Sequence, residues 1–287
     1  TAKNLETFMD EEENIFSIKN STNTEFKDSS IYITSSEKIN CYTGDRYEFL
    51  GPLSDLANPN GLRVEKLSNK TGIGYDPCCA LEINIELSKG DSKEILLLIG
   101  ESTNDESGYK MVKEYSNLNH AKVELDNVNK YWQDKLNKIK VKTPDDSMNI
   151  LMNSWLIYQT IVSRLWARAA FYQVGGAYGA RDQIQDAMNS IYFFPEECKS
   201  QILNLCKHQY VEGDVQHWWH PNLFNEVNKG IRSRYSDDLL WLPYVVSEYI
   251  KITGDYELLM EKVPFIESEV LREEEKDRYE VPKVSKD

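Results

Sequence analysis

The sequence predicts an α+β protein of two parts, a β-sandwich followed by an α-helical domain. Residues 1–118 contain the period-2 alternation of half-buried strands, whereas residues 143–287 contain apolar residues spaced three and four apart, as in amphipathic helices. Between them, the charged amphipathic stretch 119–142 predicts a linker helix. A length of 287 residues also fits about two domains.

Several short strands are expected in the first part. Short apolar runs at Ile15–Phe16 and Ile31–Thr34 predict two of them. Leu81–Leu87 alternates apolar and polar residues, and after a turn the run Glu94–Ile99 follows, so the two segments predict a β-hairpin. Gly and Asn residues predict loop over Gly51–Gly74. Antiparallel strands with one wet face favour a sandwich.

Helix signals begin at Thr143-Pro144-Asp145-Asp146, where Thr143 is the expected N-cap and the two acids suit the positive helix end. This helix should end before Gly175. Further helices are expected after Asp182, over Glu196–Gln209 and over Asp237–Thr253, with no strand pattern between them.

Composition limits the classes of function. Lys+Arg is 33 and Asp+Glu is 47, so the formal charge is 33 − 47 = −14, which argues against nucleic-acid binding. No apolar run approaches the roughly 20 residues of a membrane span, and the first residues carry no signal-peptide core. The five cysteines are odd in number and two are adjacent, which favours free thiols and a cytoplasmic location. No metal or cofactor is expected, since a zinc site from Cys206, His208, His217 and His220 lacks a CxxC pair.

The glycine-rich segment Tyr172–Asp186 is the first candidate site. Arg181 offers a fork for an oxyanion, while Asp182 and Gln185 offer the bidentate partners that sugar hydroxyls need. The alternative is a capped helix with a structural Arg–Asp pair.

Two further segments carry unusual polar residues. In Glu212–Pro221, His217 and the adjacent Trp218 and Trp219 suit sugar binding, because aromatic faces stack on the C–H faces of sugar rings. Trp155, Trp166 and Trp241 are instead expected in the helix core. In Arg232–Pro243, the paired acids Asp237 and Asp238 behind two arginines suit a pocket floor, or Ser236 or Asp237 could simply cap a helix.

These segments resemble the family 94 glycoside phosphorylases, which include cellobiose, laminaribiose, chitobiose and β-1,2-oligoglucan phosphorylases and the phosphorylase-like end of cyclic β-1,2-glucan synthases. The resemblance covers Trp155–Arg168, Gly175–Asp186, Gly213–Pro221 and Ser236–Pro243 in family order, and more weakly Glu48–Gly51 and Gly72–Leu81. It implies a β-sandwich, linker helices and the first part of an (α/α)6 barrel, with 1–118, 119–142 and 143–287 as the corresponding boundaries.

The resemblance also implies an activity. It is that of an inverting glycoside phosphorylase, a hexosyl glycosyltransferase that converts a β-linked gluco-oligosaccharide and inorganic phosphate into α-glucose 1-phosphate. Phosphate is a co-substrate there, and one carboxylic acid suffices because phosphate is itself the nucleophile. By motif, Arg181 would bind phosphate and the reacting sugar, and Asp182 would accept hydrogen bonds from that sugar. The remaining substrate-binding residues implied are Gln185, His217, Trp219, Asp237 and Asp238.

Two departures from the family pattern matter. Gly176 stands where cellobiose and chitobiose phosphorylases carry an arginine, which favours β-1,2-linked substrates. The family's general acid lies in a Gly-Asp-Trp-Asn-Asp-Gly string that this sequence lacks. We therefore expect the catalytic aspartate beyond Asp287, no catalytic residue within the chain, and an internal fragment whose partner is the remainder of the same protein. A homodimer is left open.

Two other classes remain at this point. A non-catalytic carbohydrate-binding protein would use the Trp–His segment alone. An inverting glycoside hydrolase would need two separated carboxylates, for which Asp237 and Asp238 are the candidates. Products formed with and without phosphate separate phosphorylase from hydrolase.

Overall fold

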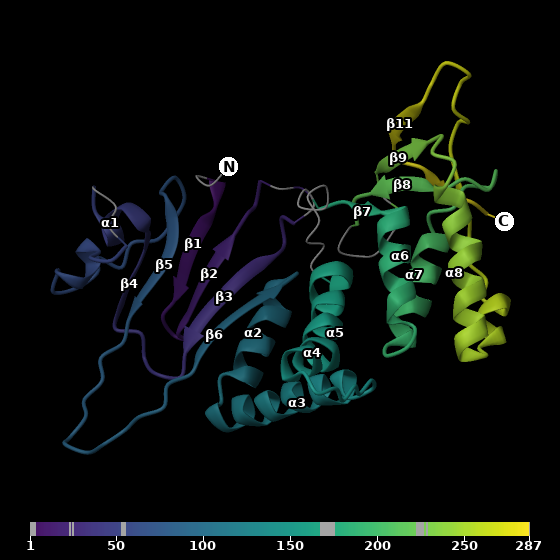
Figure 1. Cartoon of the computed structure of the whole chain (residues 1–287). Coiled ribbons are helices and arrows are strands. Elements are labelled where there is room, and N and C mark those ends of the chain that lie inside the picture. Colours follow the sequence, from purple (N-terminus) through teal and green to yellow (C-terminus); the bar gives the residue numbers. More distant parts are fainter. Residues whose placement is uncertain are drawn as a thin grey trace. The chain divides into compact units, whose positions relative to one another are not determined.

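The computed structural model describes residues 4–22, 24, 26–52, 56–166, 176–221, 227 and 229–286. The chain forms two compact units, residues 1–129 and 130–287 (Figure 1). The boundary falls inside the stretch 119–142 that the sequence predicts as a linker. Each unit is described here by itself.

The first unit is built on antiparallel strands, as predicted (Figure 1). Its main sheet has the order β1-β2-β3-β6, and β4 pairs with β5 in a second sheet. The strands are β1 (Glu6–Asp10), β2 (Ile15–Lys19), β3 (Ser30–Ser35), β4 (Cys41–Asp45), β5 (Pro77–Glu82) and β6 (Leu97–Ser102). Met9, Phe16, Ile39 and Tyr42 are buried together as one core cluster. The short helix α1 (Arg46–Leu50) follows β4, and a 3-10 turn over Asn60–Leu62 lies in the segment 56–74 that was predicted as loop.

The predicted hairpin over residues 81–99 is wrong. β5 ends at Glu82 and pairs with β4, whereas β6 begins at Leu97 and pairs with β3. Ile85 and Leu87, which supply the alternation, are 42% and 57% exposed. An alternating pattern makes a strand only where a partner covers its apolar face, and here both neighbouring strands pair elsewhere.

Helix α2 (Asp105–Tyr115) packs on the main sheet, and α3 (Leu118–Leu136) follows it (Figure 1). Val112 of α2 is buried with Ile15 and Tyr32 of the sheet. Gly108 permits this approach, because a Cβ at that position would lie 2.3 Å from the ring of Tyr32. Because α3 runs to Leu136, most of the stretch 119–142 is helical, as its amphipathic pattern predicts.

After the end of α3, the helices of the second unit resume at Asp146. One helical stretch runs through α4 (Asp146–Ile150), a π-helical turn (Leu151–Trp155), α5 (Leu156–Gln159) and a second π-helical turn (Thr160–Trp166). Its predicted end near Gly175 lies outside the described residues. The N-cap is Asp145, whose carboxylate accepts from the N–H groups of Ser147 and Met148. The predicted cap, Thr143, instead donates its hydroxyl to the carbonyl of Asp145.

Three further helices confirm the sequence-based expectation: α6 (Ala180–Ser190), α7 (Pro195–Cys206) and α8 (Asp238–Thr253). Gly254 ends α8 in the left-handed conformation, with φ of 70°. Apolar residues from all three helices form the main core of this unit. Its fully buried members include Ala187, Cys198, Ile202 and Val245.

The expectation of helices without strands is wrong for this unit (Figure 1). A four-stranded antiparallel sheet has the order β11-β9-β8-β7, and β10 pairs with β12. The strands are β7 (Tyr178–Gly179), β8 (Gln216–Trp219), β9 (Gly230–Ser233), β10 (Ile266–Glu267), β11 (Asp277–Glu280) and β12 (Lys283–Val284). Segments of two to four residues are too short to show a period-2 pattern, so the sequence carried no strand signal.

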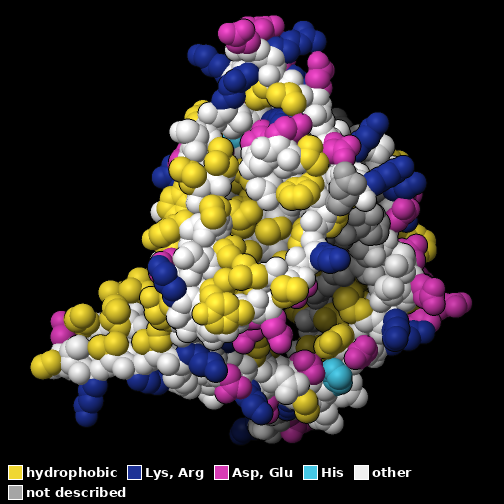
Figure 2. Space-filling model, turned by 90° about the vertical axis from the view of Figure 1, so that its right-hand side faces the viewer, with side chains coloured by type: hydrophobic (Ala, Val, Ile, Leu, Met, Phe, Trp, Pro, Cys, Tyr) yellow, Lys and Arg dark blue, Asp and Glu magenta, His cyan; other side chains and the backbone are white. Residues whose placement is uncertain are grey.

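The three tryptophans expected in the core differ in their burial. Trp155 and Trp166 are 51% and 45% exposed, so the expectation is wrong for both, whereas Trp241 is partly buried against the core of the unit. On α8, the apolar residues Leu239, Leu240 and Tyr244 are also exposed, and Figure 2 shows apolar side chains gathered on the face that carries this helix. Among the described residues, no helix has the length and apolar character to cross a membrane.

Candidate functional site

Most of the predicted site residues come together in the second unit, at the N-terminal ends of α6 and α8 beside β8. Arg181 at the start of α6 forms an ion pair with Asp237, with 3.1 Å between Nη1 and Oδ2. His217 of β8 bonds through Nδ1 to Oδ2 of Asp238 at 2.8 Å. The three segments are far apart in sequence, so this convergence is a property of the fold.

Gly179 determines how α6 begins. It is the N-cap and provides no capping side chain. The carboxylate of Asp182, in the first turn, folds back so closely that a Cβ on Gly179 would lie 2.5 Å from Oδ2. The positive end of the helix favours this position of a carboxylate. Gln185 is half-buried one helical turn beyond Arg181, on the same face of α6.

At the start of α8, the two neighbouring acids have different environments. Asp237 makes no capping hydrogen bond, so its side chain is available for Arg181, and both members of that ion pair are about half exposed. Asp238 is 3% exposed and lies in the first turn of α8. Adjacent residues of the helix thus hold one solvent-facing and one buried carboxylate.

The pKa of the His217 imidazole is raised at this site. The hydrogen bond to Asp238 raises its pKa above the ordinary value, burial opposes this, and the charges of Asp182 and Asp237 add to the rise. Its ring stacks on Tyr235, with ring centres 4.5 Å apart. The imidazole is therefore held in one orientation and in its protonated form beyond the usual pH range.

An apolar wall stands next to these polar groups. A hollow of about 270 Å³ is lined by Asp237, Leu240, Trp241 and Tyr244, and the guanidinium of Arg181 lies 5.7 Å from the Trp241 ring centre. A pyranose has hydroxyls around its rim and C–H groups on its faces, so carboxylates beside aromatic rings are suited to bind it.

Trp219 is a correction to the predicted site. Its side chain is 2% exposed and belongs to the main core, where it stacks on His208 with ring centres 3.8 Å apart and on Tyr178 at 5.9 Å. A buried ring cannot stack on a ligand. Trp218, next to it in β8, is partly buried and packs against His220 and Tyr279.

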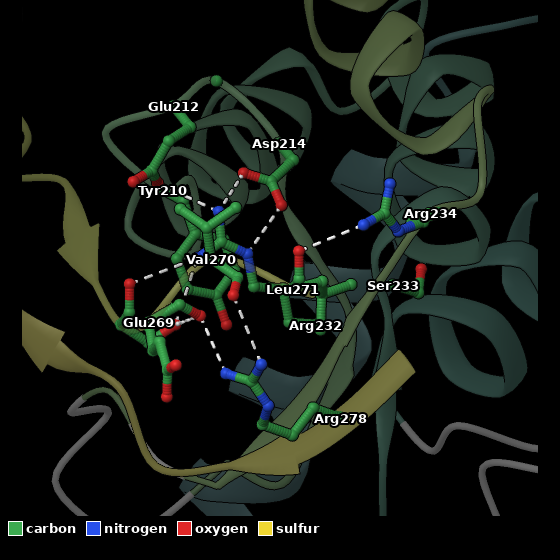
Figure 3. Close-up of polar contacts among 12 residues, drawn as sticks. Tyr210, Glu212, Asp214, Arg232, Ser233, Arg234, Glu269, Val270, Leu271 and Arg278 are labelled. Carbon is green, nitrogen blue, oxygen red and sulfur yellow. Dashed lines mark hydrogen bonds and ion pairs between the residues drawn. The ribbon is translucent and has the colours of Figure 1, made fainter. Parts of the chain in front are cut away.

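The arginines of the third segment are a second correction, because they do not form a pocket floor with Asp237 and Asp238. Arg232 is 2% exposed and pairs in bidentate fashion with Asp214, both distances being 2.8 Å (Figure 3). Arg234 donates to the backbone carbonyl oxygens of Leu271, Arg272 and Glu275. The two arginines therefore anchor the segment between β10 and β11.

The sequence reasoning missed two residues near the predicted set. Asp186, in the second half of α6, pairs with Arg164 at 2.7 Å, and burial raises the pKa of its carboxyl. Its place at the end of the Arg-Asp-Gln-Ile-Gln-Asp string was the available signal. Tyr235, which supports the ring of His217, lies in a segment that the sequence did single out.

No group of three or more potential metal ligands occurs among the residues that the structure describes. Cys206 is half-buried, and burial raises the pKa of its thiol. His208 is buried and bonds to Gln216 at 2.6 Å.

Comparison with known proteins places both units in one family. The model described as the glycosyl hydrolase 94 superfamily, catalytic domain, matches residues 131–279, and that of the glycosyl hydrolase 94 supersandwich domain matches residues 1–118. A cyclic beta-(1,2)-glucan synthase of Rhizobium meliloti is 35% identical over 255 residues, which cover 88% of this chain and 9% of that protein.

Two phosphorylases are more distant relatives. An N,N'-diacetylchitobiose phosphorylase of Vibrio furnissii is 26% identical over 82% of this chain and 32% of its own length. A 1,2-beta-oligoglucan phosphorylase of Listeria innocua is 22% identical over 40% of this chain and 11% of its own length. The chain thus spans a third or less of each of these relatives.

Proposed function

The chain belongs to the glycosyl hydrolase 94 superfamily, and on this basis we propose that it is part of an inverting glycoside phosphorylase. The substrates are a β-linked gluco-oligosaccharide and inorganic phosphate, and the products are α-glucose 1-phosphate and the shortened sugar. The supporting observation is the convergence of Arg181, Asp182, His217 and Asp237 beside an aromatic wall. The helices of the second unit form the first part of an (α/α)6 barrel in this proposal.

The charges at the site favour a sugar as the ligand of these residues. The carboxylates of Asp182, Asp237 and Asp238 lie around Arg181 and His217, so acidic side chains outnumber basic ones at the site. Carboxylates accept hydrogen bonds from hydroxyls and repel phosphate. In the proposal Arg181 contacts phosphate at the edge of the sugar subsite, and further cations come from other parts of the protein.

The reaction also needs a proton donor. A phosphate oxygen attacks the anomeric carbon on one face while the glycosidic oxygen leaves from the other and takes a proton, which inverts the anomeric centre. Asp237 and Asp238 are already engaged by Arg181 and His217, an arrangement suited to accepting hydrogen bonds. We therefore assign the general acid to an aspartate outside residues 1–287.

The proposed linkage is β-1,2. Gly176 has φ of 87°, a conformation that side chains such as arginine rarely adopt. The residue implied for cellobiose and chitobiose phosphorylases therefore does not suit this backbone. Two of the relatives described above are named for β-1,2-glucans, which supports the same linkage.

Product analysis tests the proposal. The protein that carries this chain is supplied with β-1,2-, β-1,3- or β-1,4-linked gluco-oligosaccharides, with and without phosphate. We expect glucose 1-phosphate of α configuration, released with phosphate and fastest from the β-1,2 substrate. Free glucose released without phosphate would instead identify a hydrolase, and binding without any product would identify a carbohydrate-binding protein.

A further inference from the structure

The sheet β11-β9-β8-β7 has one face turned away from the core of the second unit. Trp219 of β8 pairs with Tyr178 of β7, and their rings stack in the core that α6, α7 and α8 build on one side of the sheet (Figure 1). Successive side chains of a strand point to opposite faces, so Trp218 points to the other face. This outer face therefore carries side chains that the core does not use.

One row of the outer face is made of paired residues from all four strands, and we call it the aromatic row. Trp218 lies opposite Gly179 of β7 and Ile231 of β9, and Ile231 lies opposite Tyr279 of β11. Opposite residues of antiparallel strands share a face, so the row runs from Gly179 to Tyr279 over three strand spacings, or roughly 14 Å. The rings of Trp218 and Tyr279 meet across Ile231, with centres 5.7 Å apart.

The aromatic end of the row is open to solvent. Tyr279 is 52% exposed, and Trp218 is half-buried. His220 lies beyond Trp218 on the same face, and its ring stands at right angles to that of Trp218 with 5.3 Å between the centres. One cation and one anion flank the rings: Lys229, whose carbonyl accepts from the His220 N–H, and Asp277, two residues before Tyr279. The aromatic surface is thus flanked by balanced charges.

The other end of the aromatic row is the carboxylate of Asp182. Gly179 has no side chain, and Oδ2 of Asp182 lies 2.5 Å from the position that a Cβ would take there. Because that Cβ would point to the outer face, the Asp182 carboxylate stands on the same face as Trp218. The charge of Asp182 also contributes to the raised pKa of His217. The row is therefore continuous with the site described above.

We propose that the aromatic row binds the sugar residues that follow the reacting one in the oligosaccharide. Asp182 holds the reacting sugar in the proposed function, and the inference rests on that assignment. The second sugar packs its C–H face on Trp218 and the third packs on Tyr279, while their hydroxyls stay in water. Since the row is longer than one pyranose ring, Tyr279 contacts only substrates longer than a disaccharide.

Binding of β-1,2-linked gluco-oligosaccharides to the protein that carries this chain, measured by titration calorimetry without phosphate, tests the proposal. We expect the tetrasaccharide to bind more tightly than the disaccharide. Tyr279→Ala should weaken tetrasaccharide binding by about 3–10-fold and leave disaccharide binding unchanged. Tyr279→Phe keeps the ring and should bind both sugars as the unaltered protein does. The control Tyr256→Ala removes a ring that is 69% exposed and outside the row, and it should change neither affinity.

The result that would overturn the proposal is an unchanged affinity of Tyr279→Ala for the tetrasaccharide, or an equal loss for both lengths. Formation of glucose 1-phosphate is measured separately after phosphate is added. Product formed without any effect of Tyr279→Ala on binding would keep the proposed function and overturn the aromatic row. Length-dependent binding that Tyr279→Ala abolishes, without product, would support the row and contradict a phosphorylase. Absence of any binding would overturn both.

Discussion

Replacing Arg232 with Met should strongly destabilise the second unit, while the side-chain volume stays similar. The guanidinium is 2% exposed, makes two 2.8 Å contacts with Asp214 and one of 2.9 Å with Glu212, and lies 3.9 Å from the ring centre of Tyr210 (Figure 3). It also donates to Oγ of Ser268 at 3.1 Å. Removing it leaves two carboxylates without their cation.

The size of the effect follows from the exposure of those partners. Breaking a fully buried ion pair costs about 3–5 kcal/mol. Asp214 and Glu212 keep 27% and 40% of their side-chain surface exposed, so water can partly replace the lost cation. We therefore expect the free energy of unfolding to fall by about 3 kcal/mol, the lower end of that range. This corresponds to a fall of about 6–12 °C in the Tm of a domain of this size.

Tryptophan fluorescence is a selective assay for this change. All six tryptophans, from Trp132 to Trp241, lie in the second unit, so urea and thermal unfolding followed at their emission report on that unit. The matched control is Arg272→Met, whose guanidinium side chain is 64% exposed and lies 3.9 Å from Glu269; it should change stability by no more than about 0.5 kcal/mol. Equal effects of the two substitutions would show that desolvation of Arg232 cancels its pairing, and would refute the reasoning.

Three further predictions concern the site. Arg181→Ala should raise the KM for phosphate by about 10–100-fold, through loss of a charge-assisted contact of about 1.5–3 kcal/mol, with a smaller change in oligosaccharide affinity; an unchanged KM would make the residue structural. Gly179→Ala should leave Tm nearly unchanged but weaken sugar binding, because the new Cβ displaces only the flexible carboxylate of Asp182. Calorimetric titration with a β-1,2-linked gluco-trisaccharide measures the loss of affinity. NMR titration should show His217 protonated near pH 6, where His208, whose pKa burial lowers to about 4, is neutral. His217 stabilises the fold fully below its unfolded pKa of about 6.5, and this stabilisation is lost as pH rises through its raised folded pKa. His208 stabilises the fold fully above about 6.5, and this stabilisation is lost as pH falls toward its folded pKa of about 4. The reverse order of titration would contradict both assignments.

Features encoded within one turn of chain were predictable from the sequence alone. Gly254 marks the end of α8, as the sequence indicated, and α7 begins at Pro195, one residue before the expected Glu196. The strands at Ile15 and Ile31 followed from short apolar runs. The family also followed from the sequence, because its motifs are long and local. The roles of the individual site residues stay predictions.

Which side chains meet was decided by the tertiary structure. Trp218 and Trp219 are adjacent and identical in type, yet the antiparallel pairing of β8 buries Trp219 in the core. Arg232 and Asp237 were both expected at a pocket floor, but Arg232 turns to Asp214 while Asp237 meets Arg181. A local pattern specifies helix or strand because backbone hydrogen bonds and side-chain spacing repeat along the chain. Burial and charge pairing depend on which distant segment covers each face, and that information is present only in the folded arrangement.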